Sequence, residues 1–125
     1  MEEELLKYTV LDSQTIKDTA LVVNHNHCRC VIVMNQSNNV VGVVSDGDII
    51  RAILEGISLY SPVSQIVSHS FKYLHDSDMS SAYQYFRNDP GVTLIPVVGL
   101  SFQLNDVITI HDILNYIDVK VQDSQ

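Results

Sequence analysis

The sequence predicts an α/β fold in which two copies of one unit share a single core. The first observation is an internal repeat: displaced by 64 residues, the segment 43–50 aligns with 107–114. In both segments an apolar run typical of a β-strand leads into a hydroxyl residue and, three positions later, an aspartate. The second observation is size, because 125 residues with 46% hydrophobic content suit one compact domain, whereas either half alone would have a marginal core. We therefore expect one pseudo-symmetric structural unit.

The first half is expected to fold as helix, strand, helix, strand, strand and helix, over 2–8, 8–11, 16–23, 28–34, 40–44 and 46–54. Ser13 or Thr15 can cap the second of these helices, whose apolar residues recur at helical spacing. The polar run 24–27 stops that helix, and Gly56 ends the last one.

The second half repeats the order from the strand onward, over 71–74, 79–88, 92–98, 102–109 and 110–117. Between the halves, Pro62 can start a short connecting helix within 58–69. The polar tail is expected to fray. The expected boundaries are therefore 1–60 for the first repeat, 61–118 for the second and 119–125 for the tail.

Charge excludes several partners. The formal net charge is -8 and only seven residues are Lys or Arg, which argues against nucleic acid and against an anionic membrane surface. The first residues are acidic where a signal peptide would be basic, so we expect a cytoplasmic protein. Cys28 and Cys30 are two positions apart in an expected strand, a poor spacing for a disulfide, and fit a reducing compartment.

Each strand-to-helix junction has two compatible interpretations. Ser45-x-x-Asp48 and Thr109-x-x-Asp112 can be capping boxes, which satisfy early helical N–H groups and need no ligand. They can also be cradles, because a helix N-terminus receives phosphate and a carboxylate can accept both hydroxyls of a ribose. The duplication of the motif favours two equivalent binding sites.

At these junctions the chain resembles the cystathionine β-synthase (CBS) domain family. The segment 40–49, Val-Val-Gly-Val-Val-Ser-Asp-Gly-Asp-Ile, resembles the signature strand-turn-helix of that domain, and 95–98 resembles a strand of a second copy. The resemblance covers nearly the whole chain as a tandem pair. It implies two β-α-β-β-α repeats packed sheet to sheet about a pseudo-two-fold axis, with a cleft on each side that binds AMP, ADP, ATP or S-adenosylmethionine.

The resemblance also implies roles for individual residues. Asp48 and Asp112 would hold ribose hydroxyls, and Ser45 and Thr109 would face phosphate. The remaining candidates for nucleotide binding would line adenine or belong to the acidic turn and its helix in the first repeat: Thr15, Val31, Asp78, Ile95, Asp46 and Arg51.

The acidic turn is closest to the CBS pairs attached to sugar-phosphate nucleotidyltransferases, and secondarily to those of sugar-phosphate isomerases. The chain departs from that pattern at Ile50, where an arginine is usual. In the second repeat, Asp106 replaces the usual glycine and Asn115 stands where Arg51 would. Each change removes positive charge or adds negative charge beside a phosphate position, so we expect the second cleft to be the weaker site.

Other constellations favour neither a metal site nor an enzyme. The cluster His25, His27, Cys28 and Cys30 lies within six residues, too short a span to surround zinc. Asp46-Gly47-Asp48 also matches the metal-binding DxD of a nucleotide-sugar transferase, but so short a match is common by chance. No nucleophile and base recur together, and His111 fits an exposed first-turn position.

We therefore expect a regulatory module, not an enzyme, that requires no cofactor and senses an adenine nucleotide or S-adenosylmethionine. It would form a homodimer through its helical faces and control a catalytic domain in cis or trans, such as a sugar-phosphate nucleotidyltransferase. The alternative is an interaction module in which the caps are only caps and dimerisation is the whole function.

Overall fold

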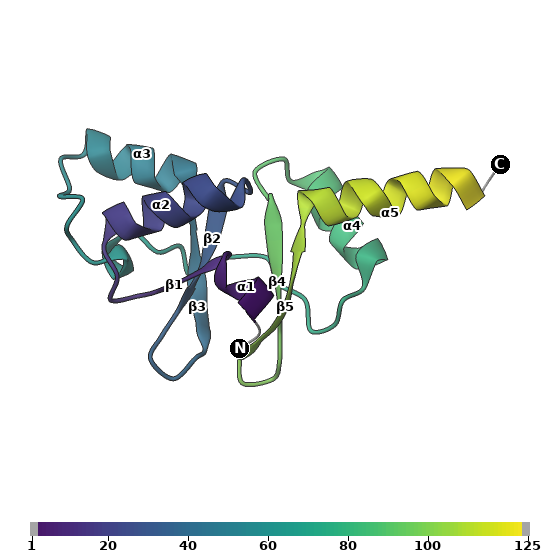
Figure 1. Ribbon diagram of the computed structural model, residues 1–125, viewed down its shortest axis with the longest axis horizontal. Coiled ribbons are helices and arrows are strands. Elements are labelled where there is room, and N and C mark those ends of the chain that lie inside the picture. Colours follow the sequence, from purple (N-terminus) through teal and green to yellow (C-terminus); the bar gives the residue numbers. More distant parts are fainter. Residues whose placement is uncertain (1–2, 124–125) are drawn as a thin grey trace.

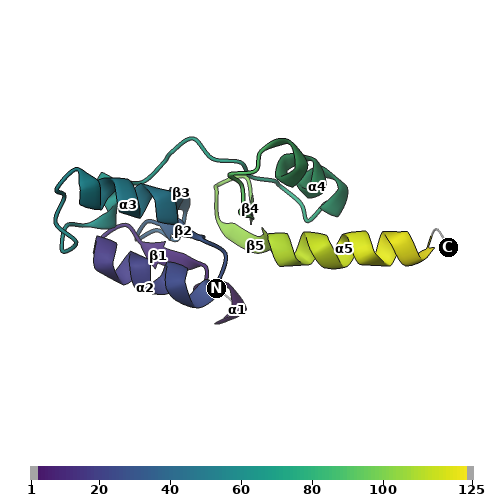
Figure 2. The same ribbon diagram turned by 90° about the horizontal axis from the view of Figure 1, so that it is seen from above.

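The computed structural model describes residues 3–123, which form two α/β halves packed side by side through their sheets (Figures 1 and 2). The elements of the first half are α1 (Glu3–Leu6), β1 (Thr9–Leu11), α2 (Ile16–Asn26), β2 (Cys30–Met34), β3 (Val40–Ser45) and α3 (Asp46–Leu54). A 3-10 turn, Val63–Gln65, lies in the linker. The second half contains α4 (Met79–Asn88), β4 (Leu94–Val98), β5 (Leu104–Thr109) and α5 (Ile110–Asp123). The predicted α/β class is confirmed.

Three apolar clusters follow from the period-2 alternation of the central strands. In β2, Cys30, Ile32 and Met34 belong to a cluster between the two sheets, together with Leu94 and Val98 of β4. The alternate residues of β2, Val31 and Val33, belong to a second cluster under α2 and α3. A third cluster lies under α4 and α5. Both β2 and β4 are buried along their whole length, so the layers run helices, sheet, sheet, helices.

The first sheet has the order β1-β2-β3, whereas the second contains only β4 and β5. The strand expected over 71–74 is therefore wrong: Leu74 makes only an isolated parallel bridge to Val97. The cause is Pro96. In the first repeat the Ile32 N–H donates to the Tyr8 carbonyl at 2.7 Å, and Pro96 occupies the position of Ile32 but has no N–H to donate.

The last helix is longer than expected. α5 continues to Asp123, so the expected helix end at residue 117 is wrong and residues 119–123 of the expected tail are helical; residues 124–125 lie outside the described part of the chain. Lys120 and Tyr116, four residues apart, lie on the same face of this extension. The Lys120 ammonium is 5.7 Å from the centroid of the Tyr116 ring. The polar composition of the tail concealed this continuation.

The linker crosses the first sheet at Gly42. A Cβ at this position would lie 2.3 Å from the Val67 Cγ1 atom and 2.4 Å from the Ser68 carbonyl oxygen, so only glycine fits. Ser68 in turn pairs with Val43 on β3, through N–H···O bonds of 2.9 and 3.1 Å. The linker thus adds a short backbone contact to the edge of β3.

Candidate functional site

Both strand-to-helix junctions are capping boxes. At α3, the Ser45 hydroxyl accepts the Asp48 N–H at 3.1 Å, and the Asp48 carboxylate accepts the Ser45 N–H at 2.9 Å. At α5, the Thr109 hydroxyl accepts the Asp112 N–H at 3.2 Å, and the Asp112 carboxylate accepts the Thr109 N–H at 2.8 Å. The predicted capping geometry is confirmed at both sites, and it fixes the direction of each carboxylate.

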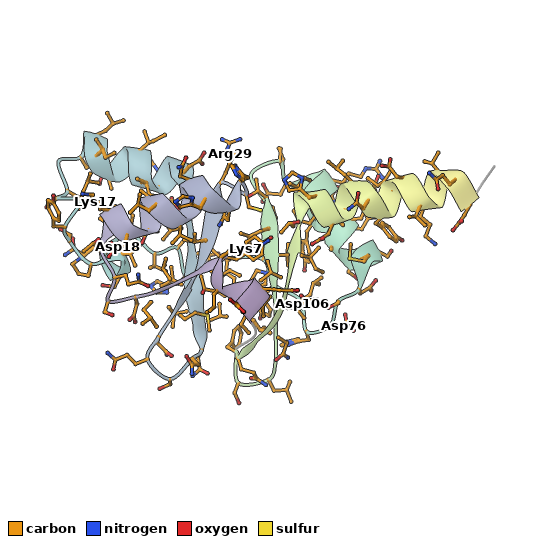
Figure 3. All side chains as sticks on the ribbon, in the orientation of Figure 1. Lys7, Lys17, Asp18, Arg29, Asp76 and Asp106 are labelled. Atoms are coloured by element: carbon orange, nitrogen blue, oxygen red, sulfur yellow. The ribbon has the colours of Figure 1, made fainter. Side chains whose placement is uncertain are left out.

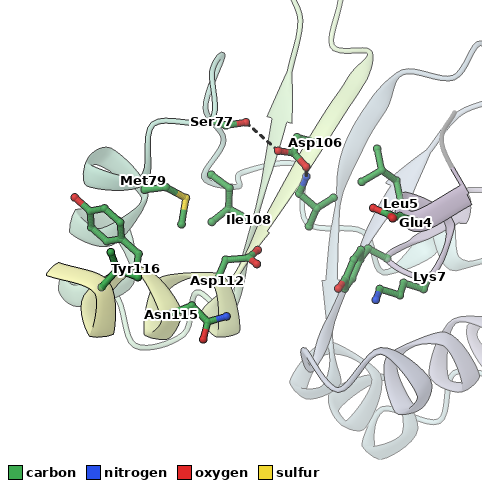
Figure 4. Close-up of a pocket in the computed structure, with 13 residues that line it drawn as sticks. Glu4, Leu5, Lys7, Ser77, Met79, Asp106, Ile108, Asp112, Asn115 and Tyr116 are labelled. Atoms are coloured by element: carbon green, nitrogen blue, oxygen red, sulfur yellow. Dashed lines mark hydrogen bonds between the residues drawn. The ribbon is translucent and has the colours of Figure 1, made fainter. Parts of the chain in front are cut away.

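Each capping carboxylate also opens into a cleft between the two halves. We call the first cleft the cavity of about 310 Å³ that Ser45 and Asp48 line, and the second cleft the cavity of about 770 Å³ that Asp112 lines (Figure 4). The Asp48 side chain is 23% exposed, and Asp112 is exposed. Neither carboxylate is sealed by packing, so both helix mouths are open to a ligand.

The first cleft draws residues from both repeats and from the linker. Val43, Ser45 and Asp48 line it from the first repeat, and its other walls come from the linker and from the turn before β4: Ser68, Ser70, Phe71, Lys72, Asp89, Gly91, Val92, Thr93 and Leu94. Both oxygens of the Asp48 carboxylate accept a hydrogen bond, Oδ2 from the Ser45 N–H and Oδ1 from the Arg51 guanidinium. Lys72 contributes the positive charge among the lining residues.

The second cleft also joins the two repeats. Glu4, Leu5, Lys7 and Tyr8 line it from α1 and the turn before β1. The opposite wall comes from the second repeat: Ser77, Met79, Asp106, Val107, Ile108, Asp112, Asn115, Tyr116 and Val119. The Ser77 hydroxyl donates to the Asp106 carboxylate at 2.9 Å. Three carboxylates and one ammonium line this cleft, so its field is negative.

The pKa values of both cysteines are raised by burial and by the capping carboxylates. Burial raises the pKa of Cys30 to about 12, and the nearby Asp48 carboxylate adds to the effect. Burial also raises the pKa of Cys28, with a further contribution from the charge of Asp112. Both thiols are buried and unpaired, so they are protonated members of the core.

Four of the expected adenine contacts lie outside both clefts. Val31 and Ile95 are 0% exposed and pack beneath the helices. Thr15 closes a capping box at α2 with Asp18. Asp78 is the exposed N-cap of α4, where hydrogen bonds from Ser81 lower its pKa.

Sequence neighbours of three of these residues do line the clefts. Cys30 and Leu94, one position before Val31 and Ile95, face the first cleft. Ser77 and Met79 flank Asp78 and line the second. Strand alternation places Cys30 and Leu94 on the face of each strand opposite to Val31 and Ile95, so this signal in the sequence points to Cys30 and Leu94 as lining residues.

Asp46 and Arg51 line neither cleft. The Asp46 carboxylate accepts a hydrogen bond from the Arg29 guanidinium at 2.8 Å, on the outer side of α3. A separate cavity between α2 and α3 contains that pair. Arg51 is 64% exposed and reaches the first cleft only through Asp48.

Within residues 3–123, no three His, Cys, Asp or Glu side chains are grouped closely enough to hold a metal ion. Among the described helices, none has the length and apolar character needed to cross a membrane.

Comparison with known proteins agrees with this architecture. The family model for the CBS domain matches residues 3–55. An uncharacterized protein of Helicobacter pylori (strain 26695) is 30% identical over 108 residues, which are 84% of this chain and 32% of the relative. The chain thus spans about a third of the length of that relative.

Three solved structures share the fold. A putative acetoin utilization protein, AcuB, from Vibrio cholerae has a TM-score of 0.79 at 17% identity, over 94% of this chain and 89% of its own. A CBS domain protein from Pyrobaculum aerophilum, complexed with AMP, has a TM-score of 0.71 at 24% identity, over 93% of this chain and 96% of its own. The CBS domain pair of the protein MJ0100, in complex with 5′-methylthioadenosine and S-adenosyl-L-methionine, has a TM-score of 0.72 at 15% identity, over 90% of this chain and 88% of its own. Residues 3–55 therefore match the family model of the CBS domain, and the chain as a whole has the fold of a CBS domain pair.

Proposed function

We propose that this chain is a regulatory module that binds an adenosine compound in its clefts, with an adenine nucleotide or S-adenosylmethionine as the ligand. The observation that carries the proposal is that each capping carboxylate opens into a cleft beside a helix N-terminus. Asp48 and Asp112 would hold ribose hydroxyls, and Ser45 would face a phosphate in the cleft that Lys72 also lines, whereas Thr109 is buried and lines neither cleft. Two structures of the same fold contain AMP, or methylthioadenosine with S-adenosylmethionine, which supports this ligand class.

Regulation would follow from the shared walls of the clefts. Asp48 of the first repeat and Thr93 of the second line the same cleft, so a ligand in it contacts both halves. A ligand biases two arrangements of the halves only if it binds one arrangement better than the other. A ligand that contacts both halves can have this difference in affinity, whereas one held by a single repeat would not sense their relative position.

The controlled enzyme would be attached to the module or bound by it in the cytoplasm, and a sugar-phosphate nucleotidyltransferase is the candidate that the acidic turn favours. The chain spans about a third of its Helicobacter pylori relative, so that protein has length for a further domain. A homodimer would pair the helical faces, because α2 and α3 carry four exposed apolar side chains: Leu21, Ile50, Ile53 and Leu54.

Thermal melting with AMP, ATP and S-adenosylmethionine, each added singly, tests the proposal. A ligand present at a hundred times its Kd stabilises the folded state by about 2.7 kcal/mol, which for a domain of this size raises the Tm by roughly 10 °C. Asp48→Ala should lose the part of the shift that arises from the first cleft, and Asp112→Ala the part from the second.

Asp18→Ala is the matched control. Asp18 closes the same kind of capping box at α2 but lines neither cleft. It lies at the far end of the first half from Lys7 and Asp106, two residues that line the second cleft (Figure 3). This variant should therefore lose a cap and keep the full ligand shift. If no compound raises the Tm and the chain forms a tight dimer, the interaction module is the correct function.

A further inference from the structure

Asp106 distinguishes the second cleft from the first. At the equivalent position of the first repeat stands Gly42, where the linker residues Val67 and Ser68 pack directly on β3. On β5 this position carries a carboxylate that lines the cleft. The first cleft, partly filled by Ser68, has about 310 Å³, and the second has about 770 Å³. The second cleft therefore gains both room and a hydrogen-bond acceptor at the same place.

Two hydrogen bonds fix the orientation of this acceptor. The Ser77 hydroxyl donates to Asp106 Oδ2 at 2.9 Å, and the Val107 N–H donates to Oδ1 at 2.8 Å. An ionised carboxylate can accept about four hydrogen bonds and donates none, so each oxygen retains capacity for one more donor. Asp106 is half-buried. The oriented Asp106 carboxylate therefore faces the cleft as a hydrogen-bond acceptor, and a ligand can bond to it only through a hydrogen-bond donor.

The distance between Asp106 and the helix mouth matches the length of a nucleoside. Asp106 precedes Thr109 by three strand residues, which is about 10 Å at 3.3 Å per residue. Asp112 lines the same cleft on α5, and Ile108 and Met79 lie to one side of the two carboxylates (Figure 4). In the second cleft the Asp112 Oδ1 atom has no arginine on it, because Asn115 stands where Arg51 does in the first repeat. A ribose held by Asp112 would thus lay its base against Ile108 and Met79, with the base edge facing Asp106.

We propose that Asp106 is a specificity-determining residue that selects a 6-amino purine over a 6-oxo purine in the second cleft. This inference rests on the proposed function, since it requires an adenosine-type ligand there. The 6-amino group of adenine is a donor and pairs with the carboxylate. The 6-oxo group of hypoxanthine or guanine is an acceptor, so a 6-oxo base would leave two acceptors facing each other and lose the hydrogen bond.

Adenosine and inosine test the inference, because the two nucleosides differ at this base position. Isothermal titration calorimetry on the full chain carrying Asp48→Ala isolates the second cleft. In that background adenosine should bind roughly tenfold more tightly than inosine or better, the usual size of a single-contact base discrimination. Asp106→Asn should reduce this preference by about tenfold, because an amide can donate to the 6-oxo group as well as accept. Glu55→Gln, an equal charge change at the exposed end of α3, should leave the preference within about twofold.

A second variant keeps the inference falsifiable if Asp106→Asn does not fold. Ser77→Ala removes the exposed hydroxyl that orients the carboxylate, and it should reduce the preference severalfold. An unchanged preference in either folded variant would overturn the inference. If wild type binds adenosine but the Asp48→Ala background does not, the inference fails while the proposed function stands for the first cleft. If wild type binds no adenosine compound, the proposed function fails as well.

Discussion

Replacing Gly42 with alanine should destabilise the chain severely. To relieve the 2.4 Å contact between a Cβ and the Ser68 carbonyl to the ordinary 3.4 Å, the linker must retreat by about 1 Å. That movement stretches the two Val43–Ser68 hydrogen bonds, now 2.9 and 3.1 Å, beyond bonding range. The two lost bonds cost about 2 kcal/mol together, and overpacking adds about 1–3 kcal/mol. We expect Gly42→Ala to lower the free energy of unfolding by about 3–5 kcal/mol, out of the 5–15 kcal/mol typical of a domain.

Gly47→Ala is the matched control, since it adds the same methyl group two residues beyond the end of β3. There the nearest atom to the new Cβ is the flexible Arg51 guanidinium at 3.4 Å, and alanine favours a helix by up to about 1 kcal/mol. Urea unfolding followed by circular dichroism measures both variants, with m-values compared to verify two-state behaviour. Equal urea midpoints for Gly42→Ala and Gly47→Ala would refute the proposed close approach of linker and β3.

Two further predictions concern the cap and the buried thiols. Ser45→Ala should lower the free energy of unfolding by about 1 kcal/mol, because the α3 cap is lost. The control Ser13→Ala, at an exposed position, should change this free energy by less than about 0.5 kcal/mol. Equal losses for the two variants in urea unfolding would contradict the capping assignment. Because burial raises the pKa of Cys30 to about 12, iodoacetamide at about pH 8 should alkylate this thiol far more slowly in the folded chain than in urea. The pKa of Cys30 is higher in the folded chain than in the unfolded chain, so its contribution to stability should be constant below about pH 8.5 and should fall as the pH rises further. Labelling is read by mass spectrometry, and equal labelling rates in the folded and unfolded chains would contradict the burial of Cys30.

The fold could be predicted from the sequence because its signals are local and duplicated. The hydroxyl and aspartate at each helix mouth specify a cap by themselves, and both capping boxes form as expected. The failures arose where one residue acts at a distance. Pro96 removes the donor that a strand over 71–74 would need, and that loss becomes visible only when the parallel partner of β4 is known.

The walls of the clefts were harder to predict than the helix mouths. Ser77 and Asp106 are 29 positions apart in sequence, yet the Ser77 hydroxyl bonds the Asp106 carboxylate. In the sequence, Asp106 is recognisable only as a missing glycine, which adds negative charge beside a phosphate position. Its positive role depends on the space that the linker leaves free on β5, which no local pattern encodes. The contribution of α1 to the second cleft was missed for the same reason.

The first turn of the chain also bears on how such modules can be cut and recombined. Because Glu4 to Tyr8 form a wall of the pocket that belongs otherwise to the C-terminal repeat, that repeat cannot be transplanted alone with its pocket intact. A deletion that trims these opening residues would leave every strand of the second sheet in place and still breach the compartment beside it. A fragment that keeps this compartment whole must therefore include both repeats, starting from α1.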